Sequence, residues 1–335
     1  MLFLRRQRGR DRGSTGETER KVGVRTEVRV GGPAGGGGGG RGGKGVVAWS
    51  WGPLGVLAGF GVVAVAGFAA FGQDPARVSM LSESAVRFYA VSFGFFAQAH
   101  ILLAGAVLGL ELWRRARWGW LASLGAVYAV SLGSELLGTS AGVPFGAYEY
   151  TSLLGAKWLG LVPVLIPLSW FLMAVPSYGL AARVAAAGGP GTPEGGVRGA
   201  GIRVFLGSLL LLAWDLSLDP AMSEVTRYWV WGERGPYYGM PLMNLVGWYV
   251  TGLALMGALE ALRSRRWVDR VPARWQAAFY GANLLLPLGM SLAAGFWGVA
   301  VATGVTLGAV AVWARGRRRR SAAPVRASAR VVEAA

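Results

Sequence analysis

The residues of this chain that could do chemistry are a few carboxylates next to long apolar segments. Glu135, Asp215 and Asp219 each stand near the C-terminal end of such a segment. Asp215 and Asp219 are four residues apart, which puts both carboxyl groups on one face of a helix. Two like charges so placed cannot both ionise cheaply, and the dipole of a helix C-terminus disfavours a negative charge. The pattern favours a neutral carboxylic acid, which is what a general acid requires, although a structural hydrogen-bonded pair fits the same spacing.

The composition excludes several other kinds of chemistry. The 335 residues include no cysteine and one histidine, His100. Thiolate metal sites, iron–sulfur clusters and thiol nucleophiles are therefore excluded, and neither a metal nor an organic cofactor is expected. His100 falls in the middle of an apolar segment, where an interhelical hydrogen bond is the expected role and a proton relay is the alternative.

The hydropathy of the chain places this chemistry in a membrane protein. Hydrophobic residues make up 53% of the sequence and charged residues only 15%, against roughly a quarter in soluble domains. A spanning helix needs about 20 mostly apolar residues. Eight segments qualify: 46–71, 88–113, 118–138, 158–182, 202–219, 241–262, 276–293 and 297–314. We therefore expect an all-α polytopic transmembrane helix bundle of about eight spans, formed by a single domain over residues 46–314, in the cell membrane.

The net charge of +17 is concentrated at the two ends of the sequence. Residues 1–45 hold 11 basic and 4 acidic residues, and they predict a disordered, glycine-rich tail that is dispensable for chemistry. Residues 315–335 hold 7 basic residues and 1 acidic residue, and they predict a basic cytoplasmic tail. The loops expected inside carry 11 arginines against 5 basic residues in the loops expected outside, so both termini should be cytoplasmic. Basic clusters beside spans fix topology, and no nucleic-acid partner is expected.

Two further carboxylates have a simple structural interpretation. Glu111 precedes Arg115 by four residues, and Glu260 precedes Arg265 by five, each near a segment end. We expect both to form ion pairs at the membrane surface.

Two aromatic loops rich in glycine and proline, residues 143–150 and 229–244, flank Glu135, Asp215 and Asp219. Irregular backbone at membrane depth is tolerated only where it is buried in protein or lines a cavity. Aromatic rings can form an interfacial belt, but their faces also stabilise a cation without trapping it. The loops therefore predict a pocket beside the carboxylates.

Two sequence blocks in this region resemble a known family. Residues 135–170 and 214–248 are similar to integral-membrane carotenoid biosynthesis proteins, which include the CruF-type carotenoid 1′,2′-hydratases and the archaeal bisanhydrobacterioruberin hydratases. The resemblance runs over residues 88–262. It implies hydration of the terminal ψ-end C=C (1′,2′ position) of an acyclic or monocyclic carotenoid to a tertiary alcohol. The carotenoid would come from the lipid bilayer and water would be the other reactant, with other membrane enzymes of the carotenoid pathway as candidate partners.

Hydration by acid catalysis gives each candidate residue a role. We expect Asp215 or Asp219 to donate the proton, and Glu149 or Glu135 to act as its partner or to orient water. Asn244 would hold the water. The residues expected to bind the substrate are Trp214, Trp170, Tyr148, Tyr238, Phe145, Asn244 and Trp248. Of these, the first four would face the carbocation.

Two other functions stay open at this point. A UbiA-like membrane prenyltransferase of the lycopene elongase type would also use membrane-embedded aspartates, but it needs Mg²⁺ and two aspartate-rich clusters. A non-catalytic carotenoid-binding or transport protein would need a polar path through the bilayer. A retinal-binding receptor is excluded because the only lysines, Lys21, Lys44 and Lys157, all lie outside the spans.

Overall fold

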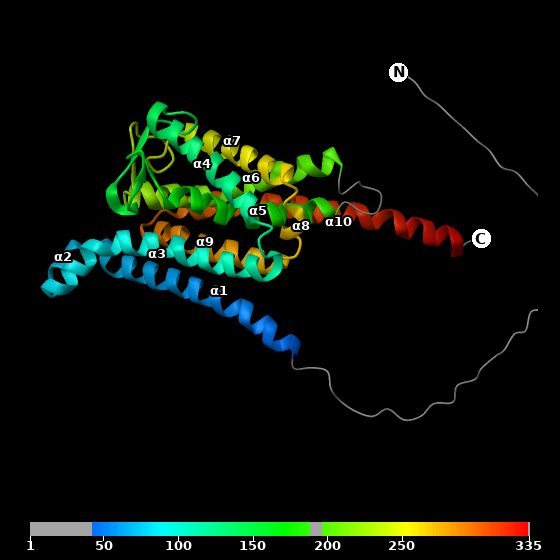
Figure 1. Cartoon of the computed structure of the whole chain (residues 1–335), viewed down its shortest axis with the longest axis horizontal. Coiled ribbons are helices and arrows are strands. Elements are labelled where there is room, and N and C mark those ends of the chain that lie inside the picture. The colour runs from blue at the N-terminus through cyan, green and yellow to red at the C-terminus, as the bar shows by residue number, and fades with distance from the viewer. Residues whose placement is uncertain (1–41, 188–195, 334–335) are drawn as a thin grey trace, which may run out of the picture. The chain divides into compact units, whose positions relative to one another are not determined.

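The computed structural model describes residues 42–187 and 196–333 (Figure 1). The expected tail over residues 1–45 lies almost wholly outside this part of the chain. The described elements fall in one compact unit, Gly43–Ala335, apart from the first residue of the first helix.

Long helices lie side by side and run between two ends of a bundle (Figure 1). They are α1 (Gly42–Gly67), α3 (Glu83–Ala116), α4 (Leu121–Ala141), α5 (Leu165–Ala186), α6 (Val197–Asp219), α7 (Leu242–Ala261), α9 (Ala273–Ala293) and α10 (Trp297–Glu333). Shorter helical pieces are η1 (Phe68–Gly72), α2 (Pro75–Ser79), η2 (Ser152–Leu154), η3 (Pro220–Val225) and α8 (Arg265–Val268). The π-helical turns η1 and η3 continue α1 and α6 directly. Helix α10 extends through most of the expected basic tail at residues 315–335.

Within the described residues, seven helices are long and apolar enough to cross a membrane, which confirms an all-α polytopic membrane protein. Helix α9 is not among the seven, although it also runs from one end of the bundle to the other. The Gln276 amide in its first turn donates to the Val268 carbonyl of α8 at 3.1 Å, and the Ala293 carbonyl at its far end accepts from Gln73. Buried polar residues such as Gln276 and Asn283 lower its hydropathy. With α9 included, the described helices cross the bundle eight times.

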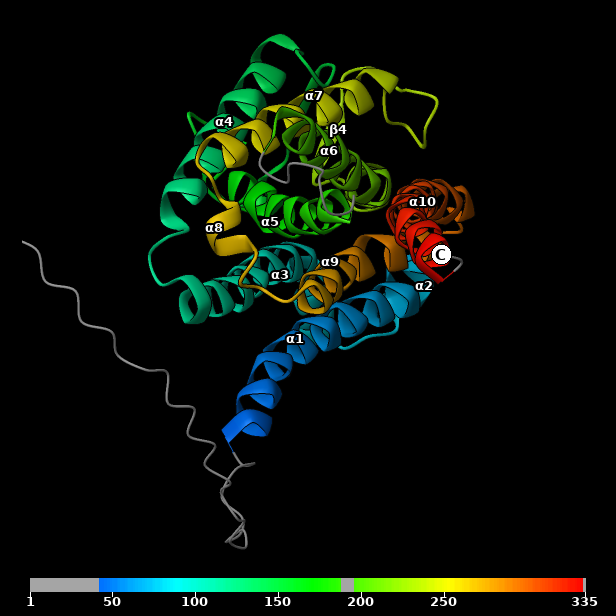
Figure 2. The ribbon, with the colours of Figure 1, turned by 90° about the vertical axis from the view of Figure 1, so that its right-hand side faces the viewer.

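Helix α5 lies at the centre of the bundle and packs against α3, α4, α6, α7 and α9 (Figure 2). Small residues let the neighbouring helices approach closely, as is usual between membrane helices. A Cβ atom added at Gly207 on α6 would lie 2.5 Å from the Met256 sulfur on α7. A Cβ atom added at Gly179 on α5 would lie 1.6 Å from the Gln276 side-chain oxygen on α9.

Short strands join the two aromatic loops at the left-hand end of the bundle in Figure 1, called here the strand end. Strand β1 (Tyr148–Tyr150) pairs antiparallel with β4 (Trp229–Trp231), and β2 (Lys157–Trp158) pairs with β3 (Val162–Pro163). The expected span over 158–182 was wrong at its start. The β2–β3 hairpin turns through Gly160 at a φ of +73°, so the helix begins only at Leu165.

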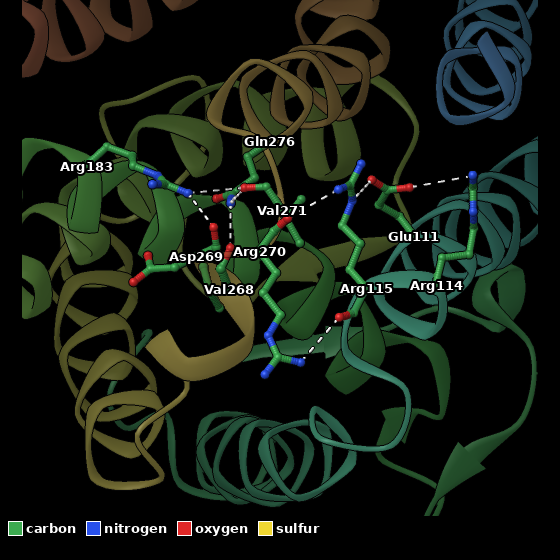
Figure 3. Close-up of polar contacts among 9 residues, drawn as sticks. All are labelled: Glu111, Arg114, Arg115, Arg183, Val268, Asp269, Arg270, Val271 and Gln276. Atoms are coloured by element: carbon green, nitrogen blue, oxygen red, sulfur yellow. Dashed lines mark hydrogen bonds and ion pairs between the residues drawn. The ribbon is translucent and has the colours of Figure 1, made fainter. Parts of the chain in front are cut away.

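At the opposite end of the bundle, called the α8 end, arginine side chains donate hydrogen bonds to backbone carbonyl groups of neighbouring segments (Figure 3). Arg115 on α3 pairs with Glu111, as expected, and its guanidinium also donates to the Arg270 carbonyl at 3.3 Å. Arg183 on α5 donates to the Asp269 carbonyl at 2.8 Å. The segment that follows α8 is thereby bound to both α3 and α5.

The expected partner of Glu260, Arg265, lies near enough for its charge to act on this carboxylate, but the main contacts of Glu260 are with two other residues. The Arg203 guanidinium on α6 donates its Nε to Glu260 on α7 at 2.8 Å, and the Tyr178 hydroxyl donates to the same carboxylate at 2.6 Å. Arg265 lies 3.3 Å from Asp269. Arg203 is almost fully buried, so this interhelical ion pair lies inside the bundle at its α8 end.

Candidate active site

Glu135 on α4 is the centre of a buried hydrogen-bonded cluster at the strand end. Its Oε1 accepts from the Trp170 indole nitrogen at 2.8 Å, and its Oε2 accepts from the Tyr150 hydroxyl at 2.8 Å. The Tyr148 hydroxyl donates to the same Oε2. All three partners are donors, so the oxygens of Glu135 are held as acceptors.

Strand β1 explains which side chains reach Glu135. Successive residues of a strand point to opposite faces, so Tyr148 and Tyr150 share the buried face and Glu149 points outward. Burial, together with the neighbouring charge of Glu135, raises the pKa of Tyr148 and of Tyr150 well above the ordinary value. Both phenols therefore stay protonated and available as donors. The structure does not bring Glu149 together with the other carboxylates.

The second cluster contains the aspartate pair at the end of α6. Asp215 and Asp219 are both buried, and the Asn244 amide nitrogen at the start of α7 donates to Asp219 and lies 3.4 Å from Asp215 Oδ2. The same nitrogen lies 3.0 Å from the Met240 sulfur. Asp215 Oδ1 has no hydrogen-bond partner among the described residues. One amide group thus serves two carboxyl groups, an arrangement in which a proton shared between the aspartates supplies a missing donor.

A small cavity of about 30 Å³ joins the two clusters. Glu135, Tyr148, Asp219 and Asn244 line it, whereas Asp215 does not. A volume of this size holds about one water molecule, and the polar groups around it can bind one. Asp219 is therefore the aspartate that faces the same small space as Glu135.

Tryptophan rings form much of the wall around this cavity. Trp170 stacks on Trp248 with ring centroids 3.9 Å apart, and Trp214 meets Trp248 edge to face at 5.8 Å. Phe145 packs on Trp170 at 6.4 Å. A Cβ atom at Gly247 would lie 2.5 Å from the Phe145 ring, so glycine is needed there for the loop to approach α7.

A second, larger cavity of about 420 Å³ adjoins the small one. The two share four lining residues, Ile166, Ser169, Leu218 and Trp229. Most of the larger cavity is apolar, and Trp214 lies in its wall. His100 also lines it and interacts with the Asn283 side chain of α9, in agreement with an interhelical role.

Tyr238 lies apart from the other expected site residues. Its ring stacks on Phe296 at 4.5 Å, and its hydroxyl accepts from the Gly298 backbone nitrogen at 3.1 Å. Neither cavity includes it. Its neighbour Tyr237 instead turns toward α6, where its hydroxyl donates to the Leu216 carbonyl at 2.9 Å.

Several residues of the site were not expected from the sequence. Tyr150 donates to Glu135, Met240 accepts from the Asn244 amide, and Trp229 and Trp231 line the small cavity. All four stand within the two aromatic loops, so alternation along a strand at 148–150 was the one signal that could have selected Tyr150. Among the described residues, no group of three or more histidine, aspartate or glutamate side chains could hold a metal ion.

Comparisons with known proteins point to one family. The family model described as carotenoid biosynthesis protein matches residues 96–311. A bisanhydrobacterioruberin hydratase from Haloarcula japonica is 32% identical over 166 residues, which cover 49% of this chain and 50% of the relative, so the chain spans about half the length of that relative. No solved structure matches the chain. Because the family model covers well over half of the sequence, including both carboxyl clusters, the chain belongs to the carotenoid biosynthesis protein family of integral membrane proteins.

Proposed function

We propose that this protein hydrates the terminal ψ-end C=C of an acyclic or monocyclic carotenoid, at the 1′,2′ position, to give a tertiary alcohol. One observation carries the proposal: a small polar cavity lined by Asp219 and Glu135 adjoins a large apolar cavity. An alkene held in the apolar cavity could extend its end past the shared wall toward an acid and a water site. The matching relative, which is named a hydratase, supports the same reaction class.

Asp219 is the proton donor in this proposal. Its proton goes to the less substituted alkene carbon, the π electrons form the new C–H bond, and the neighbouring carbon becomes a tertiary cation. Water adds its oxygen to that carbon and loses a proton to Glu135, whose oxygens are held as acceptors. Return of a proton from Glu135 to Asp219 restores the site, so one water molecule is consumed in each turnover. Asp215 acts as the carboxyl partner that shares the proton with Asp219.

The aromatic wall stabilises the cation in this scheme. Trp170 and Trp248 line the small cavity with Asp219 and Glu135, and Trp214, which contacts Trp248, lines the large cavity. Ring faces attract a cation through their quadrupole and offer it no nucleophilic atom. In this scheme, water held in the small cavity is the nucleophile. The Trp170 indole also positions Glu135, so it links the wall to the base.

Expression in a lycopene-producing bacterial host tests the proposal. Chromatography and mass spectrometry of the pigments should show a gain of one water per modified end. The Asp219→Asn variant should leave lycopene unchanged, whereas Glu149→Gln, which alters the exposed carboxylate of β1, should behave as the unaltered protein. If cells that hold the unaltered protein, folded and inserted in the membrane, still contained only lycopene, the hydratase proposal would be refuted. Pigments that gain isoprenoid units, in a Mg²⁺-dependent manner, would instead support a prenyltransferase.

A further inference from the structure

The large cavity occupies only the half of the bundle next to the strand end. Along α3 its lining runs from Ala85 to Ile101, about 24 Å at 1.5 Å per residue. Along α9 it runs only from Asn283 to Met290, about 10 Å on the same basis. Toward the α8 end the interior is filled by the buried rings of Trp275, Phe279 and Tyr178. The cavity therefore has a packed floor near the middle of the bundle.

The mouth of this cavity lies on the side of the bundle. Val63 on α1, Phe71 on η1 and Phe88 on α3 line the cavity and are also exposed, with exposed fractions of 60%, 37% and 57%. Apolar side chains that are exposed on spanning helices face lipid. Closer to the middle of the bundle, α1 and α3 are in contact, because Phe60 on α1 packs against Phe96 on α3 with ring centroids 5.2 Å apart. The cavity is thus open to the bilayer between α1 and the first half of α3.

A whole carotenoid is too long for this space. An extended carbon chain advances about 1.2 Å per bond, so a carotenoid backbone of about 30 bonds is roughly 35 Å long. The longest lined path, about 24 Å along α3, is clearly shorter. The volume agrees, since about 420 Å³ lies in the lower half of the range of about 300–1,000 Å³ for pockets that hold drug-sized ligands.

From these dimensions we propose that the protein takes in one end of a carotenoid through the side opening between α1 and α3, while the other end stays in the bilayer. The inference rests on the proposed hydration. A substrate with two reactive ends is then hydrated in two separate binding events, and the half-hydrated product leaves the protein between them. The far end of the carotenoid stays in the bilayer and does not contact the protein. The substrate class is therefore any carotenoid with one open-chain end.

An isotope chase tests the release of the half-hydrated product. Full-length protein in liposomes receives deuterated lycopene for less than one turnover per site, and then a twentyfold excess of unlabelled lycopene. If the half-hydrated product leaves the protein, labelled half-hydrated product should accumulate. The amount of labelled doubly hydrated product should then be at least tenfold lower than in a sample that receives no unlabelled lycopene. Labelled doubly hydrated product that is insensitive to the chase would overturn the inference. If no hydrated product forms from any substrate, the proposed function itself fails, which is a separate result.

The side opening has a matched pair of test variants. Phe88 and Phe95 are both exposed phenylalanines of α3, at 57% and 55%, but only Phe88 lines the cavity. Phe88→Trp should raise KM for lycopene at least fivefold with kcat little changed, and Phe95→Trp should leave both within twofold. A carotenoid with one cyclised end should keep kcat/KM within about threefold of lycopene, including the factor of two for its single reactive end. Equal effects of the two tryptophans, or loss of the cyclised substrate, would contradict end-first binding from the bilayer.

Discussion

Replacing Asp219 by asparagine isolates the proton that the proposed reaction needs. The substitution conserves the shape of the side chain and one carbonyl oxygen, which can still accept from the Asn244 amide. Because Asp219 is buried within α6 and keeps this contact, we expect the variant to fold and to insert normally. The transferable proton is the property that is lost.

The magnitude follows from the place of each aspartate. General acid catalysis contributes about 10²–10⁴ in rate, so Asp219→Asn should lower kcat by at least about 10²-fold, or about 2.7 kcal/mol at 1.36 kcal/mol per tenfold. Asp215 does not line the small cavity and acts through its neighbour, so Asp215→Asn should cost less, about tenfold. Binding of the carotenoid should survive in both variants, because the apolar cavity is unchanged.

Purified variants in liposomes, with the pigments resolved by chromatography, give the assay. Glu149→Gln is the control, since it is the same kind of change on an exposed side chain of β1, and it should leave kcat within twofold. Near-normal turnover in Asp219→Asn, with folding confirmed by size-exclusion chromatography and pigment binding, would refute the role of Asp219 and would leave Asp215 as the donor. If Asp215→Asn also kept near-normal turnover, the donor would move to Glu135.

Three other outcomes are expected. Trp170→Phe keeps a ring stacked on Trp248 but removes a hydrogen bond to Glu135. A loss of about 1.4 kcal/mol should lower kcat about tenfold at nearly constant KM. An unchanged kcat would contradict the positioning role of Trp170. Arg203→Met removes the buried ion-pair partner of Glu260, which is itself partly exposed and keeps its Tyr178 contact, so the fold should be destabilised by about 2 kcal/mol. This should appear as a lower melting temperature with activity per folded molecule retained, and an unchanged melting temperature would contradict the role of the pair. Reporter fusions in the α8 segment should report cytoplasm and fusions next to β1 the outside; the reverse pattern would contradict the orientation inferred from the basic loops.

The carboxylates of the site could be predicted from sequence for a simple physical reason. An ionisable group in a spanning helix is costly to bury, so Glu135, Asp215 and Asp219 stand out from the apolar residues around them. Aromatic loops with glycine and proline follow these helix ends in the sequence, so they could be recognised as part of the same site. Both features lie within short stretches of sequence.

Features that depend on distant pairing could not be predicted. Strand β1 has three residues and pairs with β4 about 80 residues later, so the strand itself could not be recognised locally. Without it, the alternation that selects Tyr150 rather than Glu149 as a partner of Glu135 could not be applied. The hydrogen-bonded partner of Glu260, Arg203, was missed because it is distant in sequence, whereas Arg265, whose charge also acts on Glu260, is near. Nearness in sequence is a good guide along one helix, as for Glu111 and Arg115, and a poor one between helices.

The most direct test of the proposed hydration follows the atoms of water into the product. Purified protein in liposomes should be given lycopene in H₂¹⁸O, and in a parallel sample in D₂O, and the products analysed by mass spectrometry. The proposal predicts one ¹⁸O in each new hydroxyl group and one deuterium on the adjacent carbon, with the same yield after treatment with EDTA. A hydroxyl group without ¹⁸O, or activity abolished by removal of metal, would contradict acid-catalysed addition of water.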